Sequence, residues 1–372
     1  MNKKNILKII IIFIAIISIF MVLVVIFYPS KYNLDFTKSS LTYYINKYSN
    51  NTEYTPELLK TSNGKILGTV FDTSSQNAIL KTVGIFEFDL DNEQFEFFKY
   101  DDGKRIFDFL VINNSIYYVE IQEDDETFYW SFIKTDKNFD NKEILSNGMI
   151  KNVFNYPRIL TTEDGKILLI SITDDENGEE KFQFTTYFQG QETILMEDKG
   201  STLADTGVLL YNIANVYIYK NKIVYTVVDE NKIQHLNTFD IEKSIIKNQY
   251  TNFNSTTIMY NYKFLSNGLY IQLILKDNEN TSQILYINEK NTMKFSGATN
   301  TFDNLLNESI LLFHNNGDKW KAFFSSKKKI YNIKANVSNI YPKYLISENK
   351  VIIQDFKNNF YVGKLDYIED SY

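Results

Sequence analysis

The chain has 372 residues, of which 44% are hydrophobic and 16% aromatic, with no cysteine and a formal net charge of −7. Without cysteine there can be no disulfide, no thiol nucleophile and no thiolate metal site. The net negative charge repels polyanions, so nucleic acid is not expected as a partner and anionic wall polymers are disfavoured.

The first predicted element is a transmembrane helix over residues 9–28. This run carries no charged residue, and its apolar side chains include Ile9, Phe13, Phe20 and Tyr28. Twenty residues at helical rise cover about 30 Å, the thickness of the bilayer's hydrocarbon core. The segment therefore predicts a single membrane anchor.

The flanking charges predict the direction of this anchor. Lys3, Lys4 and Lys8 precede it, whereas only Lys31 follows closely. Cytoplasmic flanks carry the excess of positive charge, so residues 1–8 are expected in the cytoplasm and the remainder outside. A cleaved signal peptide is the alternative, although it would have a shorter apolar region of about 7 to 15 residues and a small-residue cleavage site.

The preference for lysine over arginine suggests what kind of organism the protein comes from. Arg105 and Arg158 are the only arginines, and lysine, asparagine and isoleucine are abundant. This usage is typical of an AT-rich genome, and a low-GC Gram-positive bacterium is our hypothesis. The predicted location is then the cell membrane, with a single span and an extracellular domain.

Residues 29–53 are expected to join the anchor to the folded domain. Ser30 to Ser40 reads as a short tether. The following segment, LTYYINKY from Leu41, could supply a missing outer strand to the end of the chain. Such a strand would close a ring by covering an edge that otherwise faces water.

Residues 54–372 carry a repeat, in which a turn-like pair leads into an apolar run seven times. Successive turns lie about 40 to 56 residues apart. The seven runs are KILGTVFD from Lys65, SIYYVEIQ from Ser115, KILLISIT from Lys166, KIVYTVVD from Lys222, LYIQLILK from Leu269, SILLFHNN from Ser309 and KVIIQDFK from Lys350. Further aromatic strands flank each run, giving about four strands per unit.

This period predicts an all-β fold, specifically a β-propeller with seven four-stranded blades; six or eight blades remain open. A four-stranded unit recurring every 40 to 50 residues is typical of a propeller blade. One blade cannot bury both faces alone, so neighbouring blades must cover each other. The segment from Lys199 to Leu210 reads as a loop insertion in the third unit.

The segment TTEDGKILLISI from Thr161, with the strand and turn that follow it, resembles blades of extracytoplasmic propellers of the TolB and YVTN-like kind. The resemblance covers most of residues 54–366 as a period rather than as identity. It implies a platform for binding proteins, glycans or small ligands. No blade carries the Trp-Asp signature, and no catalytic residue can be carried over.

Candidate catalytic and stacking residues are few. His235 lies in the predicted strand IQHLNTF and His314 ends the run LLFH, so both are expected to pack or hydrogen-bond within strands. Trp130, Trp320 and Tyr129 could stack on sugars or peptide side chains. Core positions between neighbouring blades are the favoured interpretation for these aromatics.

Metal and anion sites are weakly indicated. The segment TDDENGEE from Thr173 matches part of a calcium loop, but Thr173 and Phe184 stand where carboxylates belong, so a hairpin is expected. Asp89, Asp91 and Glu93 likewise read as a strand connection. The lysine run Lys327 to Lys329 reads as a solvated turn. No cofactor and no metal are expected.

The favoured hypothesis is a membrane-anchored binding or scaffold module for an envelope protein or cell-wall component. The alternative is a carbohydrate-active or other enzyme with carboxylates, a histidine and tyrosines in the axial funnel. A deep pocket with converging polar groups would favour the enzyme, and an exposed apolar patch would favour the binder. A sensor domain is a third possibility, but the predicted cytoplasmic part is too short to signal alone.

Overall fold

The computed structural model describes most of the chain beyond the N-terminal segment. The described residues are 32–49, 54–74, 80–124, 127–150, 155–174, 180–199, 215–229, 231–275, 278–289, 291–296, 302–307, 310–315, 319–327, 329–337, 340–347, 350–355 and 357–367. These residues form one short helix and 28 strands, so the all-β prediction is confirmed.

Five four-stranded sheets follow one another along the chain, each an antiparallel meander. The first is β2 (Tyr54–Ser62), β3 (Lys65–Asp72), β4 (Lys81–Asp89) and β5 (Phe95–Lys99). The second is β6 (Arg105–Ile112), β7 (Ser115–Asp124), β8 (Thr127–Asp136) and β9 (Glu143–Ile150). The third is β10 (Arg158–Thr161), β11 (Ile167–Asp174), β12 (Glu180–Phe188) and β13 (Gln191–Lys199). The fourth is β14 (Tyr217–Tyr219), β15 (Lys222–Val228), β16 (Gln234–Asp240) and β17 (Ile245–Asn252). The fifth is β18 (Thr257–Leu265), β19 (Gly268–Leu275), β20 (Asn278–Ile287) and β21 (Thr292–Ser296).

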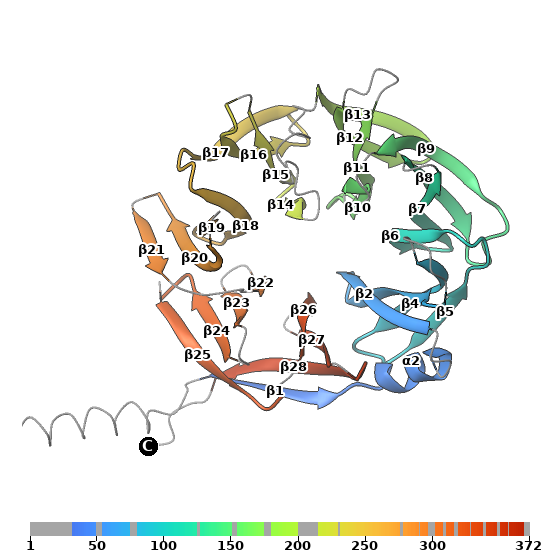
Figure 1. Ribbon diagram of the computed structural model, residues 1–372, viewed down its shortest axis with the longest axis horizontal. Coiled ribbons are helices and arrows are strands. Elements are labelled where there is room, and N and C mark those ends of the chain that lie inside the picture. The colour runs from blue at the N-terminus through green and yellow to red at the C-terminus, as the bar shows by residue number, and fades with distance from the viewer. Residues whose placement is uncertain are drawn as a thin grey trace, which may run out of the picture.

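The remaining strands form one sheet of eight, in the order β22-β23-β24-β25-β1-β28-β27-β26. Its strands are β1 (Tyr32–Lys38), β22 (Phe302–Asn307), β23 (Ile310–Asn315), β24 (Lys319–Phe324), β25 (Lys329–Ala335), β26 (Ile340–Ser347), β27 (Lys350–Asp355) and β28 (Phe360–Tyr367). The six sheets stand around a common centre, with β2, β6, β10, β14 and β18 innermost (Figure 1). The protein is therefore a β-propeller.

The turn residues explain why strands begin where they do. Asn63 and Gly64 have φ values of 49° and 76° and connect the paired residues Ser62 and Lys65. Two central residues with positive φ form the tight turn whose twist matches a hairpin, and asparagine and glycine tolerate that geometry best. Each of the seven predicted apolar runs overlaps the second strand of a four-strand unit, and Lys220 and Asn221 before β15 repeat the pair of positive φ values.

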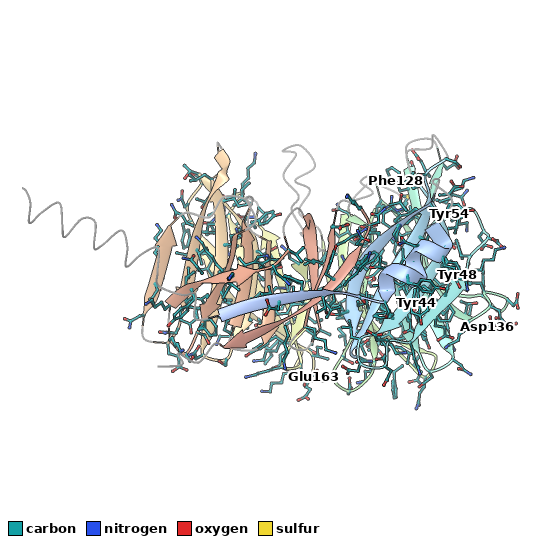
Figure 2. The ribbon with its side chains drawn as sticks, turned by 90° about the horizontal axis from the view of Figure 1, so that it is seen from below. Tyr44, Tyr48, Tyr54, Phe128, Asp136 and Glu163 are labelled. Carbon is teal, nitrogen blue, oxygen red and sulfur yellow. The ribbon has the colours of Figure 1, made fainter. Side chains whose placement is uncertain are left out.

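The ring has two faces, which we name by their connections. The turn face carries the connections from first to second and from third to fourth strand of each sheet; the loop face carries the others. Glu163 and Asp136 lie on the turn face, whereas Phe128 and Tyr54 lie toward the loop face (Figure 2). The Asn221 N–H donates to Glu163 Oε1 at 3.1 Å and joins two turns of neighbouring sheets.

The prediction of seven separate four-stranded blades is wrong, because the strands form six sheets. The merger comes from β1, which pairs antiparallel with β28 on one side and parallel with β25 on the other. The Asn336 side chain extends this parallel ladder: Phe36 N–H donates to its Oδ1 at 2.7 Å, and its Nδ2 donates to Phe36 O at 3.0 Å. One N-terminal strand thus uses both of its edges and closes the ring.

The placement of the closing strand also differs from the prediction. It lies at β1, inside the segment expected to be a tether, and LTYYINKY forms the helix α2 (Leu41–Ser49) instead of a strand. Leu41 and Ile45, four residues apart, are buried, which is the spacing of one helix face. Tyr44 and Tyr48 stack on Phe95 and Phe97 at 5.1 and 4.2 Å between ring centroids. The helix therefore covers the outer strand β5.

The predicted transmembrane helix at residues 9–28 lies outside the described residues, and so do Ile9, Phe13, Phe20, Tyr28, Lys3, Lys4 and Lys8. Within the described part of the chain, no helix is both long and apolar enough to cross a membrane. The insertion predicted from Lys199 to Leu210 also falls outside it, except for Lys199 at the end of β13.

The packing between sheets depends on a close fit around Trp130. This side chain is 1% exposed, and a Cβ atom built on Gly148 would lie 2.9 Å from its ring and 2.8 Å from Thr173 Cγ2. Gly148 is paired with Trp130 across β8 and β9. A glycine is needed there because the indole occupies the space of a side chain.

Replacing Gly148 by alanine is expected to lower the free energy of unfolding by about 1–3 kcal/mol, the usual cost of overpacking a core. Urea unfolding followed by tryptophan fluorescence measures this loss. Asn147→Ala, at the exposed neighbouring position in β9, is the matched control and should change stability by less than about 0.5 kcal/mol. Equal stability of the two variants would contradict the packing described.

Candidate functional site

Three innermost strands bring one acidic and two basic side chains together beside the centre of the ring. Lys60 of β2 reaches Asp108 of β6, with 2.5 Å between Nζ and Oδ1. Arg158 of β10 reaches the other carboxylate oxygen, with 3.1 Å between Nε and Oδ2. We call Lys60, Asp108 and Arg158 the axial triad.

Main-chain groups complete the hydrogen bonding of the triad. Asp108 Oδ2 also accepts from Ile159 N–H at 2.9 Å, and Oδ1 accepts from Phe109 N–H at 2.9 Å. Lys60 Nζ donates to Ile159 O at 2.7 Å. The carboxylate therefore joins three neighbouring sheets, as a buried charge requires if it is to remain ionised.

Burial and mutual attraction shift the pKa values of the triad. Burial acts to raise the pKa of Asp108, but the charges of Lys60 and Arg158 outweigh it and hold that pKa below its usual value. Burial lowers the pKa of Lys60, and Asp108 offsets this only in part. With all three groups ionised the triad carries one net positive charge.

A cavity of about 260 Å³ lies next to the triad, at the turn-face ends of the innermost strands. It contains the Lys60 side chain and the polar residues of the β2–β3 turn, with apolar residues from β6, β10 and β14. Its lining is Lys60, Thr61, Ser62, Asn63, Leu110, Ile159, Leu160, Thr161 and Ile218. Neither histidine is in this lining.

Besides Asp108, two other carboxylates are buried in the described part of the chain, and each has its own lysine. Glu87 is 3.3 Å from Lys65 Nζ, and burial raises its pKa. Glu120 contacts Lys104 and accepts from Tyr100 Oη at 2.6 Å. Burial and the Glu120 carboxylate raise the pKa of Tyr100. The Glu87–Lys65 pair lies within the first sheet, whereas Glu120 of β7 holds the connection between β5 and β6.

The histidines are not brought together. His235 lies on β16, where Nε2 is 3.0 Å from Asp229 Oδ2 and Nδ1 is 3.1 Å from Thr251 Oγ1. The hydrogen bond from His235 helps lower the pKa of Asp229, whose Oδ1 also accepts from Ile233 N–H at 2.9 Å. His235 therefore braces the β15–β16 connection. His314 lies on β23, in another sheet.

The three aromatic candidates, Trp130, Trp320 and Tyr129, differ in how far they are exposed to solvent. Trp130 and Trp320 are each 1% exposed, so the prediction that they belong to the core is confirmed. Trp320 lies 5.7 Å from the Phe36 ring of the closing strand. Tyr129, which neighbours Trp130 on β8, is instead 49% exposed toward the loop face.

The acidic segments form connections as predicted where the structure describes them. Asp89 Oδ1 accepts from the N–H groups of Asp91 and Asn92 at 2.8 and 2.9 Å, which holds the β4–β5 turn. Asp91 in turn contacts Lys350 at 2.5 Å. The centre of TDDENGEE lies outside the described residues. No group of three or more acidic or histidine side chains in the described chain is placed to hold a metal ion.

The lysine run also falls in a turn. Lys327 lies between β24 and β25, 5.8 and 5.6 Å from the centroids of the Phe324 and Tyr331 rings. Lys329 begins β25. The ammonium of Lys327 therefore lies beside aromatic rings at a strand connection.

Two exposed aromatic residues were not selected by the sequence interpretation. Phe253, in the connection between β17 and β18, is 79% exposed, and Tyr260 on β18 is 45% exposed. The sequence shows no signal for Phe253 beyond its polar neighbours in TNFNST. The triad had a clearer signal, because Asp108 interrupts the apolar run RIFDFLVI and Arg158 is one of two arginines.

No model of a protein family matches the chain, and no curated protein matches it. Solved structures do match. A puromycin-hydrolyzing peptidase of Mycobacterium tuberculosis has a TM-score of 0.54 at 7% identity over 81% of this chain and 50% of that one. An oligogalacturonate lyase in complex with manganese has a TM-score of 0.50 at 9% identity, over 84% and 91% of the two chains.

A virginiamycin B lyase from Staphylococcus aureus aligns over 90% of this chain and 99% of its own, with 12% identity and a TM-score of 0.48. At these identities, a likeness shows the fold alone. Neither the peptidase nor the oligogalacturonate lyase is named as of the TolB or YVTN-like kind, so the likeness extends to the propeller fold and no further.

Proposed function

We propose that the protein is a membrane-anchored, extracytoplasmic propeller that binds an envelope protein or cell-wall component through its loop face. The observation that carries the proposal is the exposure of Phe253, which leaves 79% of a large apolar side chain in water. Aromatic side chains that protrude from a rigid scaffold are the usual anchors of binding interfaces.

The location follows from the N-terminal segment. The charge-free run of residues 9–28 and the lysines before it support a single anchor with the propeller outside the cytoplasm. Lysine and asparagine usage supports a low-GC Gram-positive source. A cell-surface location would place the loop face among envelope proteins and wall polymers.

The arrangement of the axial triad favours the binding proposal over the enzyme alternative. Each of its charged groups already holds an oppositely charged partner, and Asp108 accepts from two backbone N–H groups as well. General acid–base work needs a carboxyl or imidazole group that can exchange a proton with a substrate. The triad is arranged to join sheets and not to release a proton.

The test is crosslinking in cells that carry the full-length protein, with the partners identified afterwards. We expect a reproducible envelope partner whose yield falls about tenfold for Phe253→Ala, the loss of roughly 1.4 kcal/mol typical of an aromatic anchor. Tyr43→Ala is the matched control, because Tyr43 is 71% exposed on α2 and lies away from Phe253. Equal yields from both variants would contradict the proposed anchor, and soluble glycan products released by the protein would contradict binding as its function.

A further inference from the structure

Exposed apolar side chains gather at the turn-face ends of three successive sheets. They occur at the end of β12 and in the first half of β9, β13 and β17, which follow third-to-fourth strand connections. Their exposed fractions are 61% for Ile144, 46% for Phe188, 53% for Ile194, 56% for Ile245 and 52% for Ile246. We call these five residues the apolar edge.

The closing strand enters the ring from the turn-face side. Tyr32, the first residue of β1, pairs with Tyr367 at the end of β28, and Lys364 of β28 pairs with Lys350 at the start of β27. The start of β27 follows a turn-face connection, so β1 begins on that side and ends toward the loop face. In Figure 1, β1 lies across the ring from β9, β13 and β17.

Very little chain separates β1 from the proposed anchor. Three residues, Pro29 to Lys31, lie between Tyr28 and Tyr32. Even fully extended, this connection reaches at most about 15 Å. The turn-face side of the ring at β1 must therefore stay close to the bilayer surface.

We propose that the turn face lies against the membrane that holds residues 9–28, with the apolar edge as the second contact. This inference rests on the anchoring in the proposed function. The tether fixes one side of the turn face at the bilayer, and the apolar edge lies on the opposite side of the same face. Two separated contacts on one face orient a ring, and isoleucine and phenylalanine side chains enter the headgroup boundary readily.

Because residues 29–31 would hold the ring at the bilayer, even a weak contact of the apolar edge with the membrane is enough to orient it. A short linker holds the second site at high effective concentration, so half-exposed side chains can dock although the free domain would not bind a membrane. The exposed charges at this edge give no positive excess, with three lysines and four acids: Lys142, Lys243, Lys247, Asp140, Glu143, Glu192 and Glu242. The contact is therefore apolar and independent of anionic lipid.

The consequence for function is that the loop face points away from the bilayer. Phe253, in the loop-face connection between β17 and β18, then faces the envelope, where a partner can reach it. The cavity beside the axial triad, at the turn-face ends of the innermost strands, then lies on the membrane side of the ring.

The test uses the full-length protein in vesicles of zwitterionic lipid, with a nitroxide near the top of the acyl chains. Because the chain has no cysteine, Thr193→Cys and Ser255→Cys each give one labelling site, at the apolar edge and on the loop face. We expect the fluorescence of a label at Thr193→Cys to fall about twofold on adding nitroxide lipid, and that at Ser255→Cys to stay unchanged.

Charge substitution tests the contact itself. Ile194→Glu with Ile246→Glu should abolish quenching at Thr193→Cys, whereas Tyr43→Glu with Tyr129→Glu, at exposed positions elsewhere, should preserve it. A thermal melt confirms that each variant is folded. Protein that does not float with vesicles would overturn the anchoring and with it the proposed function. Protein that floats but shows equal or reversed quenching at the two labels would overturn only the orientation.

Discussion

Replacing Asp108 by asparagine is expected to lower the free energy of unfolding by about 3–5 kcal/mol, the usual cost of removing one member of a buried ion pair. The side chain is 1% exposed, and its loss of charge would leave Lys60 and Arg158 buried without compensation. Since the carboxylate joins β2, β6 and β10, the effect should appear as a shift of the whole cooperative transition to lower urea concentration.

Asp101→Asn is the matched control for this change. Asp101 pairs with Lys99 at 2.6 Å, but both side chains are more than two-thirds exposed. Exposed pairs contribute about 0–1 kcal/mol, so the same chemical change should have little effect there. Similar losses for both variants would show that the triad does not carry the stability assigned to it.

The pH dependence of stability should identify the same carboxylate. The pKa of Asp108 is held below its unfolded value of roughly 3.9, so its stabilising contribution is complete above that pH and is lost as pH falls through the folded pKa. Wild-type stability should therefore fall more steeply in acid than that of Asp108→Asn. Parallel stability curves below about pH 4 would contradict the assignment.

Replacing Phe36 by alanine is expected to cost about 3–5 kcal/mol, because a large buried side chain is lost from the strand that closes the ring. Phe36 is 4% exposed, its ring lies 5.7 Å from that of Trp320, and it covers the face of Gly363 on β28. Without it β1 keeps Leu34 but loses the other of its two buried apolar side chains, which weakens its cover over the edges of β25 and β28.

Thr37→Ala, at the exposed neighbouring position of β1, is the control for Phe36→Ala. It keeps the backbone pairing with β28 and should change stability by less than about 0.5 kcal/mol. Tryptophan fluorescence, to which Trp130 and Trp320 both contribute, follows the opening, and urea unfolding measures the loss of stability. If Phe36→Ala unfolds at the same urea concentration as Thr37→Ala, the closing strand is dispensable.

The sequence alone determined the elements whose signals are local. Turn pairs such as Asn63-Gly64 and apolar runs such as KILGTVFD specify a hairpin through φ preferences and burial, which neighbouring residues decide. The burial of Trp130 and Trp320 and the turn at Asp89 followed from the same local chemistry. For these features the predicted and observed structures agree.

Only the tertiary structure decided how the ring closes and where charges meet. LTYYINKY has apolar and aromatic residues compatible with either a strand or a helix. The helix α2 forms because Leu41 and Ile45 find a buried cluster between the first and last sheets, while Tyr44 stacks on β5. The merger into six sheets depends on β1 meeting β25 and β28, which are about 300 residues distant. Lys60, Asp108 and Arg158 likewise form one site only when three innermost strands converge, because pairing between distant segments leaves no local pattern in a single sequence.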